Sequence, residues 1–314
     1  GSDTGGSVRQ PAALCGIVGA KPTYGRVSRY GLVAFGSSLD QISPFASTVA
    51  DAALLLEVLC GHDERDPTTL RGDDADGLLE AAQRGADRGL DGVRIGVVPD
   101  HLEAEGVEPG VTEQVRAGLA AMESAGATVV NVELPSFDLG VPAYFVTATS
   151  EASSNLARYD GVRYGRRGDA DASDLTGLLS IARGQGFGEE VQRRILLGTF
   201  SLSAGYAEAW YSQALRVRRL LLDETEAAFA AGVDLLACPT SPFTAFPLGD
   251  RADDPLAEYL CDAFTVAANL TGLPAMSVPC GLAEGLPVGL HLTAPALAED
   301  RLFTAAAALE GALA

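Results

Sequence analysis

The chain has 314 residues, 47% of them hydrophobic, which suits a large buried core in one α/β domain or two smaller ones. Its 42 acidic and 22 basic residues give a formal net charge of −20, which argues against a basic nucleic-acid-binding surface. No apolar run approaches the roughly 18–20 residues of a membrane span, and the N-terminal residues lack the pattern of a secretory signal.

The first half of the chain predicts an alternation of strands and helices after a glycine-rich opening. Residues 1–45 are rich in glycine, proline and serine, and predict loops and short strands. Residues 47–61 predict a helix, followed by a polar loop over 62–77. A strand over 92–98, a helix over 111–126 and a strand over 127–135 then predict a βαβ unit with a parallel strand pair.

The second half continues the alternation. Residues 188–230 are mostly helical in pattern, and 233–239 predict a buried strand. The remaining elements are a helix over 254–272, strands over 274–281 and 287–295, and a closing helix over 298–313. The predicted fold class is therefore α/β, with a mixed β-sheet sandwiched between layers of α-helices.

The cysteines occur singly, with no CxxC motif and no pairing with histidine. We expect reduced, mostly buried thiols in a cytoplasmic protein. The five are Cys15, Cys60, Cys238, Cys261 and Cys280.

The opening motif DTGGS has the composition of a site that binds an anion or a developing negative charge. Gly5 and Gly6 can take positive φ and turn successive N–H groups toward one point, as an oxyanion requires. Ser7 could then be a nucleophile, with the N–H groups of Thr4 to Ser7 as an oxyanion hole. The alternative is a glycine-rich turn or a phosphate cradle.

A serine nucleophile needs a base, and the sequence offers few. The histidines His62, His101 and His291 have no flanking pattern typical of a catalytic triad, and the G-x-S-x-G motif is absent. Lys21 is the single lysine, and a structural role suits it better than catalysis.

Two charged residues stand in apolar or helical surroundings. Asp262 interrupts the run LCDAFTVAANL, which we expect to be a largely buried helix, so its carboxylate needs a cationic partner or a ligand ammonium. A capping or salt-bridged aspartate is the alternative. Arg194 precedes ILLGTF and could bind a carboxylate bidentately, or could lie on an exposed helix face.

The segment GSDTGGSVRQPAALCGIVGAKPTYGRVS resembles the second half of the amidase signature. RVSRYGLVAFGSSLDQISP narrows the resemblance to the A subunits of aspartyl/glutamyl-tRNA(Asn/Gln) amidotransferases within that family. Further agreement runs through QGFGEEVQRRILLGTF and LPAMSVPCG, so the likeness covers essentially the whole chain. The resemblance implies one amidase domain over 1–314, equivalent to the C-terminal two-thirds of the family domain.

The family uses a Ser–cis-Ser–Lys triad, and the resemblance implies the site residues. Ser7 is the acyl-ester nucleophile, and Thr4, Gly5 and Gly6 join it in the oxyanion hole. The substrate-binding residues that it implies are Arg194 for the carboxylate of glutamine, Asp262 for its ammonium, and Tyr144 as a pocket hydroxyl. The catalytic lysine and the cis-serine lie upstream of GSDTGGS in this family, so we expect an N-terminally truncated subunit.

The implied activity is hydrolysis of glutamine, with ammonia passed on to convert Glu-tRNA(Gln) or Asp-tRNA(Asn) to the amidated form. The implied partners are a B subunit, which uses ATP and Mg²⁺, and a small C subunit, in a heterotrimer. No cofactor or metal is expected in this subunit. Two alternatives stay open: a stand-alone amidase of the same family, and an inactive remnant whose glycine-rich loop is only a turn or an anion nest.

Overall fold

A mixed seven-stranded sheet organises the fold. The computed structural model describes the whole chain except residues 73–74, 169–171 and 251–259. In the described part, the strand order of the sheet is β4-β2-β8-β9-β7-β5-β6. The bounds are β2 Val18–Lys21, β4 Phe45–Ala46, β5 Arg94–Val97, β6 Thr128–Asn131, β7 Leu235–Pro239, β8 Ala275–Ala283 and β9 Leu286–Thr293. A separate antiparallel pair joins β1 (Ser2–Asp3) to β3 (Gln41–Ile42).

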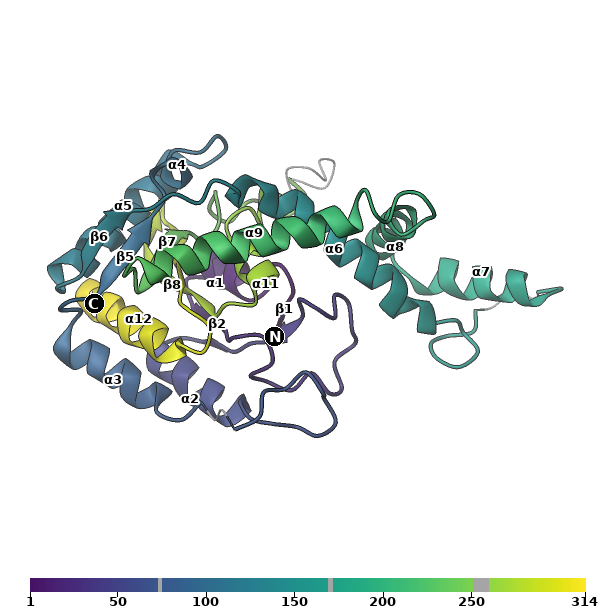
Figure 1. Ribbon diagram of the computed structural model, residues 1–314, viewed down its shortest axis with the longest axis horizontal. Coiled ribbons are helices and arrows are strands. Elements are labelled where there is room, and N and C mark those ends of the chain that lie inside the picture. Colours follow the sequence, from purple (N-terminus) through teal and green to yellow (C-terminus); the bar gives the residue numbers. More distant parts are fainter. Residues whose placement is uncertain (73–74, 169–171, 251–259) are drawn as a thin grey trace.

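Helices cover both faces of the sheet (Figure 1). Their bounds are α1 Arg9–Cys15, α2 Val49–Leu59, α3 Leu78–Arg88, α4 Pro99–Leu102, α5 Pro109–Ser124, α6 Gly140–Asn155, α7 Leu175–Gly186, α8 Glu189–Ser201, α9 Tyr211–Ala230, α11 Val266–Thr271 and α12 Glu299–Leu313. Short 3₁₀ helices span Phe137–Leu139 and Leu156–Arg158. The predicted α/β class with a mixed sheet between helical layers is confirmed.

The predicted βαβ unit is present. Strand β5 pairs in parallel with β6 on one side and with β7 on the other, and α5 connects the β5–β6 pair. The remaining neighbours in the sheet are antiparallel, because β8 and β9 form a hairpin and β2 and β4 run against their partners. The strand predictions at 92–98, 233–239, 274–281 and 287–295 are therefore confirmed, with ends shifted by a few residues.

The two faces of the sheet differ in chemistry. Met276 and Leu292 belong to the main apolar core, which they share with α5 and α12. The opposite face carries Gly19 and Gly289, and α1 lies directly on them. An added Cβ on Gly19 would lie 2.7 Å from the Cβ of Ala12, and one on Gly289 would lie 2.6 Å from the Cβ of Ala13. These glycines let α1 approach the sheet, and α1 in turn fixes the position of the turn before it.

Helix α1 is a difference from the sequence prediction, which has only loops and short strands over 1–45. It is seven residues long, too short for apolar periodicity to stand out. The Asp3 carboxylate accepts hydrogen bonds from the N–H groups of Val8 and Arg9 at its start, and Gly16 closes it in a left-handed conformation. The start of α1 is thus fixed by the Asp3 side chain, which lies outside the helix and is not part of any helical pattern in the sequence.

The predicted helix over 254–272 is wrong in its middle. Residues 261–265 form turns, and regular helix starts at Val266. Part of the predicted span, 254–259, lies outside the described residues. The turn places the Thr265 hydroxyl 2.6 Å from the carbonyl oxygen of Gly5, so a tertiary contact replaces continued helix.

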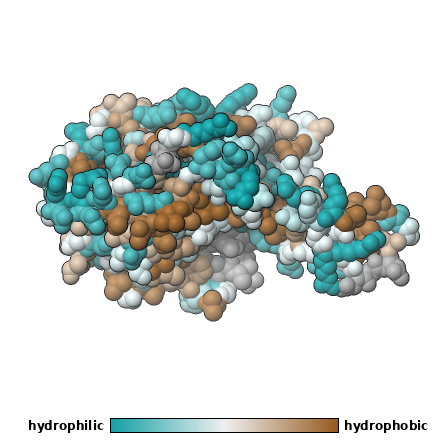
Figure 2. Space-filling model, turned by 90° about the horizontal axis from the view of Figure 1, so that it is seen from below, coloured by the Kyte–Doolittle hydropathy of each residue, from teal (hydrophilic) through white to brown (hydrophobic). Residues whose placement is uncertain are grey.

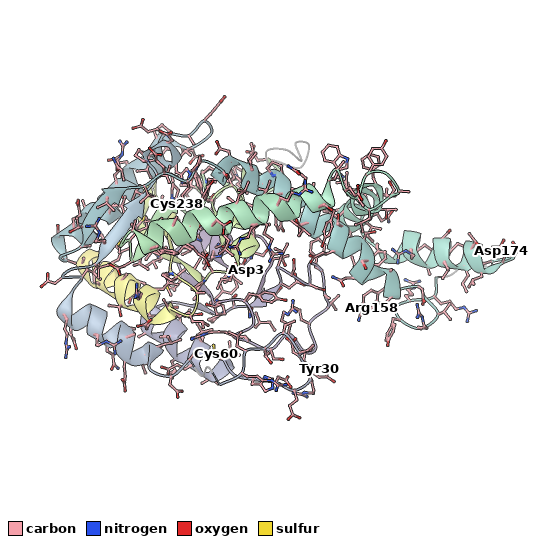
Figure 3. All side chains as sticks on the ribbon, viewed as in Figure 1. Asp3, Tyr30, Cys60, Arg158, Asp174 and Cys238 are labelled. Carbon is pink, nitrogen blue, oxygen red and sulfur yellow. The ribbon has the colours of Figure 1, made fainter. Side chains whose placement is uncertain are left out.

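Two regions lie at the periphery of the molecule. Helix α2 buries Val49, Ala52, Ala53 and Leu56, and it leaves a second apolar stripe exposed. That stripe is Leu54, Leu55, Val58 and Leu59, and Figure 2 shows an apolar area over this side of the molecule. Helices α7 and α8 form an arm that extends to one side, with Asp174 at its tip (Figures 1 and 3). In the described residues, no helix is long and apolar enough to span a membrane.

Candidate active site

The glycine-rich motif forms a turn between β1 and α1. Gly5 and Gly6 are buried, whereas Ser7 is exposed at the end of the turn. Within the described part of the chain, the N–H groups of Gly5, Gly6 and Ser7 donate to no protein acceptor. The turn therefore places the exposed Ser7 hydroxyl next to backbone N–H groups that form no hydrogen bond within the described protein.

Both glycines are required by their neighbours. An added Cβ on Gly5 would lie 2.5 Å from Cζ of Tyr144. Gly6 has φ +141°, and an added Cβ there would lie 2.2 Å from Oγ1 of Thr265 and 3.3 Å from Oδ1 of Asp262. The turn is thus held between Tyr144 on α6 and the segment 262–265, which brings two of the predicted binding residues next to the predicted nucleophile loop.

A buried ion pair supports the turn from below. Asp3 and Arg9 are both fully buried, and their side chains meet at 2.9 Å between Oδ1 and Nη2 and at 3.0 Å between Oδ2 and Nε. The second oxygen also accepts the N–H groups of Val8 and Arg9. Burial alone would raise the pKa of Asp3, but the charge and hydrogen bonds of Arg9 hold it well below its usual value. The carboxylate therefore stays ionised and clamps both ends of the turn.

Arg9 also ties the turn to two later segments. Its guanidinium donates to the Thr265 carbonyl oxygen at 2.9 Å, to Oδ1 of Asn269 at 2.5 Å and to Nε2 of His291 at 2.8 Å. Burial and the neighbouring Arg9 charge lower the pKa of His291 well below its usual value. His291 is thus neutral, and its Nε2 accepts from Arg9.

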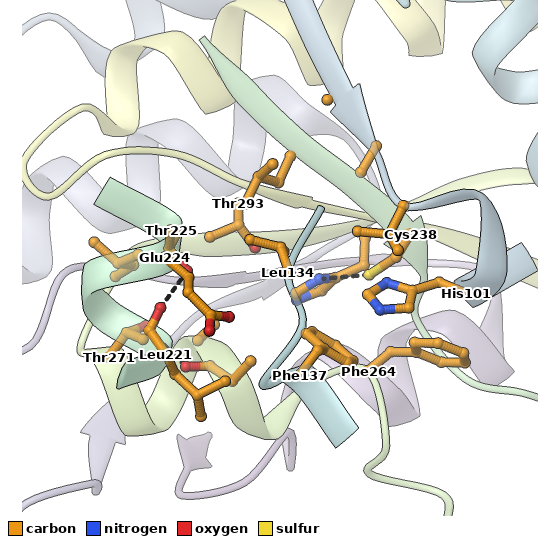
Figure 4. A pocket seen from close by; sticks show the side chains of 18 residues that line it. His101, Leu134, Phe137, Leu221, Glu224, Thr225, Cys238, Phe264, Thr271 and Thr293 are labelled. Atoms are coloured by element: carbon orange, nitrogen blue, oxygen red, sulfur yellow. Dashed lines mark hydrogen bonds between the residues drawn. The ribbon is translucent and has the colours of Figure 1, made fainter. Parts of the chain in front are cut away.

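The sequence has no motif that pairs cysteine with histidine, but the fold brings one such pair together. Nδ1 of His291 lies 3.6 Å from Sγ of Cys238, as the dashed line in Figure 4 shows. The two residues are side by side on neighbouring strands, where Cys238 of β7 is in register with His291 of β9. They line an apolar cavity of about 40 Å³, together with His101, Phe137 and Phe264. Burial raises the pKa of the Cys238 thiol to about 12, so this sulfur is protonated and unreactive.

The predicted binding residue Arg194 lies on α8, at the base of the arm. Its Nε donates to Oε1 of Glu190 at 2.6 Å, and its Cζ lies 5.6 Å from the centre of the Phe35 ring. Its side chain is 28% exposed, compared with 48% for the adjacent Arg193, so it faces inward more than its neighbour.

Electrostatics connect Tyr144 to both charged candidates. Burial raises the pKa of Tyr144, the negative charge of Asp262 raises it further, and the positive charge of Arg194 opposes them. The phenol is therefore neutral, and Asp262 and Arg194 exert the two largest charge effects on it, ahead of the carboxylates of Asp3 and Asp40. Asp262 is half-buried in the turn 261–265 rather than on a buried helix, which corrects the expected local structure.

The other candidate bases have structural contacts. Nδ1 of His62 lies 2.9 Å from Oγ1 of Thr69, and the ring of His101 packs 4.0 Å from that of Phe137. Lys21 is buried at the end of β2, where Nζ donates to the Pro22 carbonyl oxygen at 3.0 Å. Burial and then the charge of Arg9 lower the pKa of Lys21 to about 7. In the described residues, no group of three or more histidine, cysteine, aspartate or glutamate side chains is arranged to hold a metal ion.

Sequence reasoning missed several residues that hold the turn in place. Asp3 and Arg9 flank the glycine motif, and charged residues that bracket a glycine turn could have indicated a clamp. Asn269 interrupts the apolar run VAANL in the same way as Asp262, so that signal was also present. Thr265 and His291 gave no local signal, because their roles depend on contacts across the fold.

The chain is similar to known proteins over most of its length. A family model described as Amidase matches residues 1–303. The A subunit of glutamyl-tRNA(Gln) amidotransferase from Synechococcus sp. (strain RCC307) is 53% identical over 307 residues, covering 98% of this chain and 62% of the relative. The corresponding protein from Deinococcus radiodurans is 54% identical over 314 residues, covering 99% of this chain and 63% of the relative.

Solved structures share the fold. The crystal structure of the A subunit of glutamyl-tRNA(Gln) amidotransferase from Thermotoga maritima superimposes with a TM-score of 0.78 at 44% identity, covering 99% of this chain and 61% of that one. The peptide amidase from Stenotrophomonas maltophilia gives a TM-score of 0.75 at 31% identity, covering 99% and 61%. The chain belongs to the amidase family. It spans a little over three-fifths of the length of the curated relatives that it matches.

Proposed function

We propose that this chain is the glutamine-hydrolysing A subunit of a tRNA-dependent amidotransferase. The relatives from Synechococcus and Deinococcus, each more than half identical to it, carry that name. The observation that carries the proposal is the packing of the neutral phenol of Tyr144 and the carboxylate of Asp262 against the two glycines before Ser7. A site for glutamine needs such a combination, because the reacting amide must lie near Ser7 while its charged end is held elsewhere.

In the proposed reaction, Oγ of Ser7 attacks the side-chain amide carbon of glutamine. The proton of Ser7 passes through a base to the leaving nitrogen, so ammonia departs and a γ-glutamyl ester forms on Ser7. Water then hydrolyses the ester and releases glutamate. By resemblance to the family, the proton relay is the serine and lysine that precede the GSDTGGS motif in its members. His62, His101, His291 and Lys21 are engaged in the contacts described above.

The turn's backbone would stabilise the oxyanion at each step. The N–H groups of Gly5, Gly6 and Ser7 donate to no acceptor in the described protein, and Thr4 completes the set. Loss of one such donor costs about 3–4 kcal/mol in known acyl-transfer enzymes. The clamp of Asp3 on the N–H groups of Val8 and Arg9 supports this role, because it fixes the turn before substrate arrives.

The two charges would bind the amino-acid end of glutamine. Arg194 would pair with the α-carboxylate and Asp262 with the α-ammonium, while the Tyr144 hydroxyl lies beside Gly5 of the turn. The opposing effects of Arg194 and Asp262 on the Tyr144 pKa support a shared site for the three residues. A neutral aliphatic amide needs neither charge, so the pair disfavours a stand-alone amidase.

The assembly is part of the same proposal. The ammonia would pass to a B subunit that uses ATP and Mg²⁺ to activate the misacylated tRNA, with a C subunit completing the cytoplasmic heterotrimer. The net charge of −20 suits a protein that leaves tRNA binding to its partner.

The test is ammonia release by the native protein from L-glutamine and from butanamide. We expect release from glutamine, none above background from butanamide, and loss of the glutamine activity in Ser7→Ala. Preference for butanamide would support a stand-alone amidase. Equal activity of Ser7→Ala and the parent would refute the proposed nucleophile.

A further inference from the structure

Phe35 lies between the arm and the nucleophile loop, and no sequence pattern indicates a role for it. It is half-buried, and its ring packs against the apolar cluster that contains Tyr144 and Ala148 of α6. The guanidinium carbon of Arg194 lies 5.6 Å from the ring centre, within the range of a cation–π interaction. The ring of Phe35 thus contacts both the apolar cluster that contains Tyr144 and the guanidinium of Arg194, the proposed carboxylate-binding group.

The backbone of Phe35 is tied to the nucleophile loop by a carboxylate. Oδ2 of Asp40 accepts the N–H of Phe35 at 2.8 Å, and Oδ1 accepts the Thr4 hydroxyl at 2.7 Å and the N–H of Gly36 at 3.1 Å. Thr4 is the first residue of the DTGGS turn to follow the clamped Asp3. Asp40 therefore fixes the distance between the ring and the turn.

The same backbone is tied to the helix that carries Tyr144. Nδ2 of Asn155, the last residue of α6, donates to the carbonyl oxygen of Phe35 at 2.9 Å. With both its N–H and its carbonyl oxygen engaged by side chains, Phe35 has little freedom to move. A ring held this firmly can fix the position of a guanidinium that would otherwise sample many rotamers.

We infer that Phe35 is a specificity-determining residue, whose ring holds Arg194 in place to bind the α-carboxylate of an amino-acid amide. The inference rests on the proposed function. The ring face attracts the guanidinium, and Glu190 engages its Nε at 2.6 Å, so two contacts from different segments orient the same group. The apolar ring also excludes water from that side of the carboxylate, which strengthens its attraction to Arg194.

The chemistry predicts which ligands depend on Phe35. A ligand with an α-carboxylate needs an oriented Arg194, and a ligand without one does not. Glutaramic acid is glutamine without its ammonium, and 4-aminobutanamide is glutamine without its carboxylate. Weakening the ring contact should therefore affect L-glutamine and glutaramic acid alike and leave 4-aminobutanamide unchanged.

The experiment measures the Kd of the three ligands for the parent protein and for Phe35→Leu and Phe35→Trp, all carrying Ser7→Ala so that the ligands are not consumed. Leucine keeps an apolar side chain but has no π face, whereas tryptophan keeps one. We expect Phe35→Leu to bind L-glutamine and glutaramic acid about 3- to 5-fold more weakly, the size of a partly exposed cation–π contact, and Phe35→Trp to bind them like the parent. In an Arg194→Gln background, Phe35→Leu should have no further effect.

Thermal unfolding of each variant separates this role from a structural one. If Phe35→Leu weakens all three ligands equally, or none of them, the inference is wrong while the proposed function stands. If Phe35→Leu is destabilised, Phe35→Trp and the Arg194→Gln background still decide the matter. If the parent protein binds none of the three, the proposed function fails and this inference with it.

Discussion

The two sides of the glycine turn are built on opposite principles. Below it lies a buried base of Asp3, Arg9, Asn269 and His291, which are at most 2% exposed and bonded to one another. The second group, here called the rim, consists of the proposed binding residues Arg194 and Asp262, which are partly exposed and come from the arm and from a turn. Under the proposed function, the base fixes the backbone of the turn and the rim selects the ligand. Changes in the base should therefore cost stability, and changes in the rim should cost affinity.

The physical reason is the cost of burying charge. An ion pair without water must satisfy every donor and acceptor internally, and the base does so through four side chains and the backbone. The four side chains of the base can satisfy one another in only one geometry, so we expect substitutions there to destabilise the fold. The proposed role of the rim, which is to bind and release a zwitterion, requires partly exposed charges that can exchange their partners with water.

The largest expected effect comes from breaking the base. Asp3→Ala leaves the guanidinium of Arg9 buried without its counter-ion and removes the acceptor of two backbone N–H groups. We expect a loss of about 3–5 kcal/mol in the free energy of unfolding, measured by urea denaturation. Asp223→Ala, which breaks the exposed pair with Arg219, is the control and should leave the midpoint unchanged. Similar midpoints for the two variants would show that the base does not carry the stability assigned to it.

The next effect concerns the turn itself. Gly6→Ala puts a Cβ 2.2 Å from Oγ1 of Thr265, so the turn or the threonine must move. We expect labelling of Ser7 by a serine-directed phosphonate probe to slow on the order of 100-fold, as expected when an oxyanion donor is displaced. The measurement is the labelling rate by mass spectrometry.

A matched control isolates the contact from backbone strain. Gly61 has φ +137°, close to the +141° of Gly6, but an added Cβ there meets nothing within 4 Å. Gly61→Ala therefore places alanine at a similar positive φ without the contact, and it should label at the parent rate. Equal labelling of Gly6→Ala and Gly61→Ala would mean that the contact with Thr265 does not position the turn.

A smaller effect is expected at the rim. Arg194→Gln removes the guanidinium proposed to bind the glutamine carboxylate and should weaken glutamine binding on the order of 10- to 100-fold, with little change in stability. Arg193→Gln is the matched control, since Arg193 pairs with the same Glu190 but is more exposed. Calorimetry of glutamine binding distinguishes them, and equal losses in both variants would contradict the assignment to Arg194.

The smallest expected effect is a change in the pH dependence of stability. The pKa of Lys21 is about 7 in the folded protein against the usual 10.5, so above pH 7 the unfolded chain holds a proton that the folded chain has lost. Stability should therefore rise with pH over the window from about 7 to 8.5, by about 1 kcal/mol per pH unit. Lys21→Met should remove this rise. Urea midpoints across the window check it, and parallel curves for variant and parent would show that Lys21 is charged when folded.

The sequence predicts the regular elements well where periodicity is long. The β5–α5–β6 unit and the β8–β9 hairpin follow from alternating apolar patterns, which local sequence encodes. Helix α1 and the turn 261–265 do not. The start of α1 depends on Asp3, a side chain outside the helix, and the turn depends on the contact of Thr265 with the distant Gly5. Strand order in the sheet is equally a tertiary outcome.

The candidate site divides in the same way. Ser7, Gly5 and Gly6 could be selected from five consecutive letters, because a glycine pair before a serine is itself a chemical signal. The residues that support the turn could not be selected from the sequence, since Arg9 contacts His291, which is 282 residues away. Phe35 had no signal either, because an aromatic residue in a loop becomes informative only when Arg194 is seen beside it.

The proposed function depends on Ser7 taking up the acyl group of glutamine. The most direct measurement is peptide mapping of the native protein after acid quenching during glutamine turnover. We expect a γ-glutamyl ester on the tryptic peptide that ends at Arg9, located at Ser7 and released by hydroxylamine. A glutamyl adduct on another side chain, such as the exposed thiol of Cys15, or turnover with Ser7 unmodified at every quench time, would contradict it.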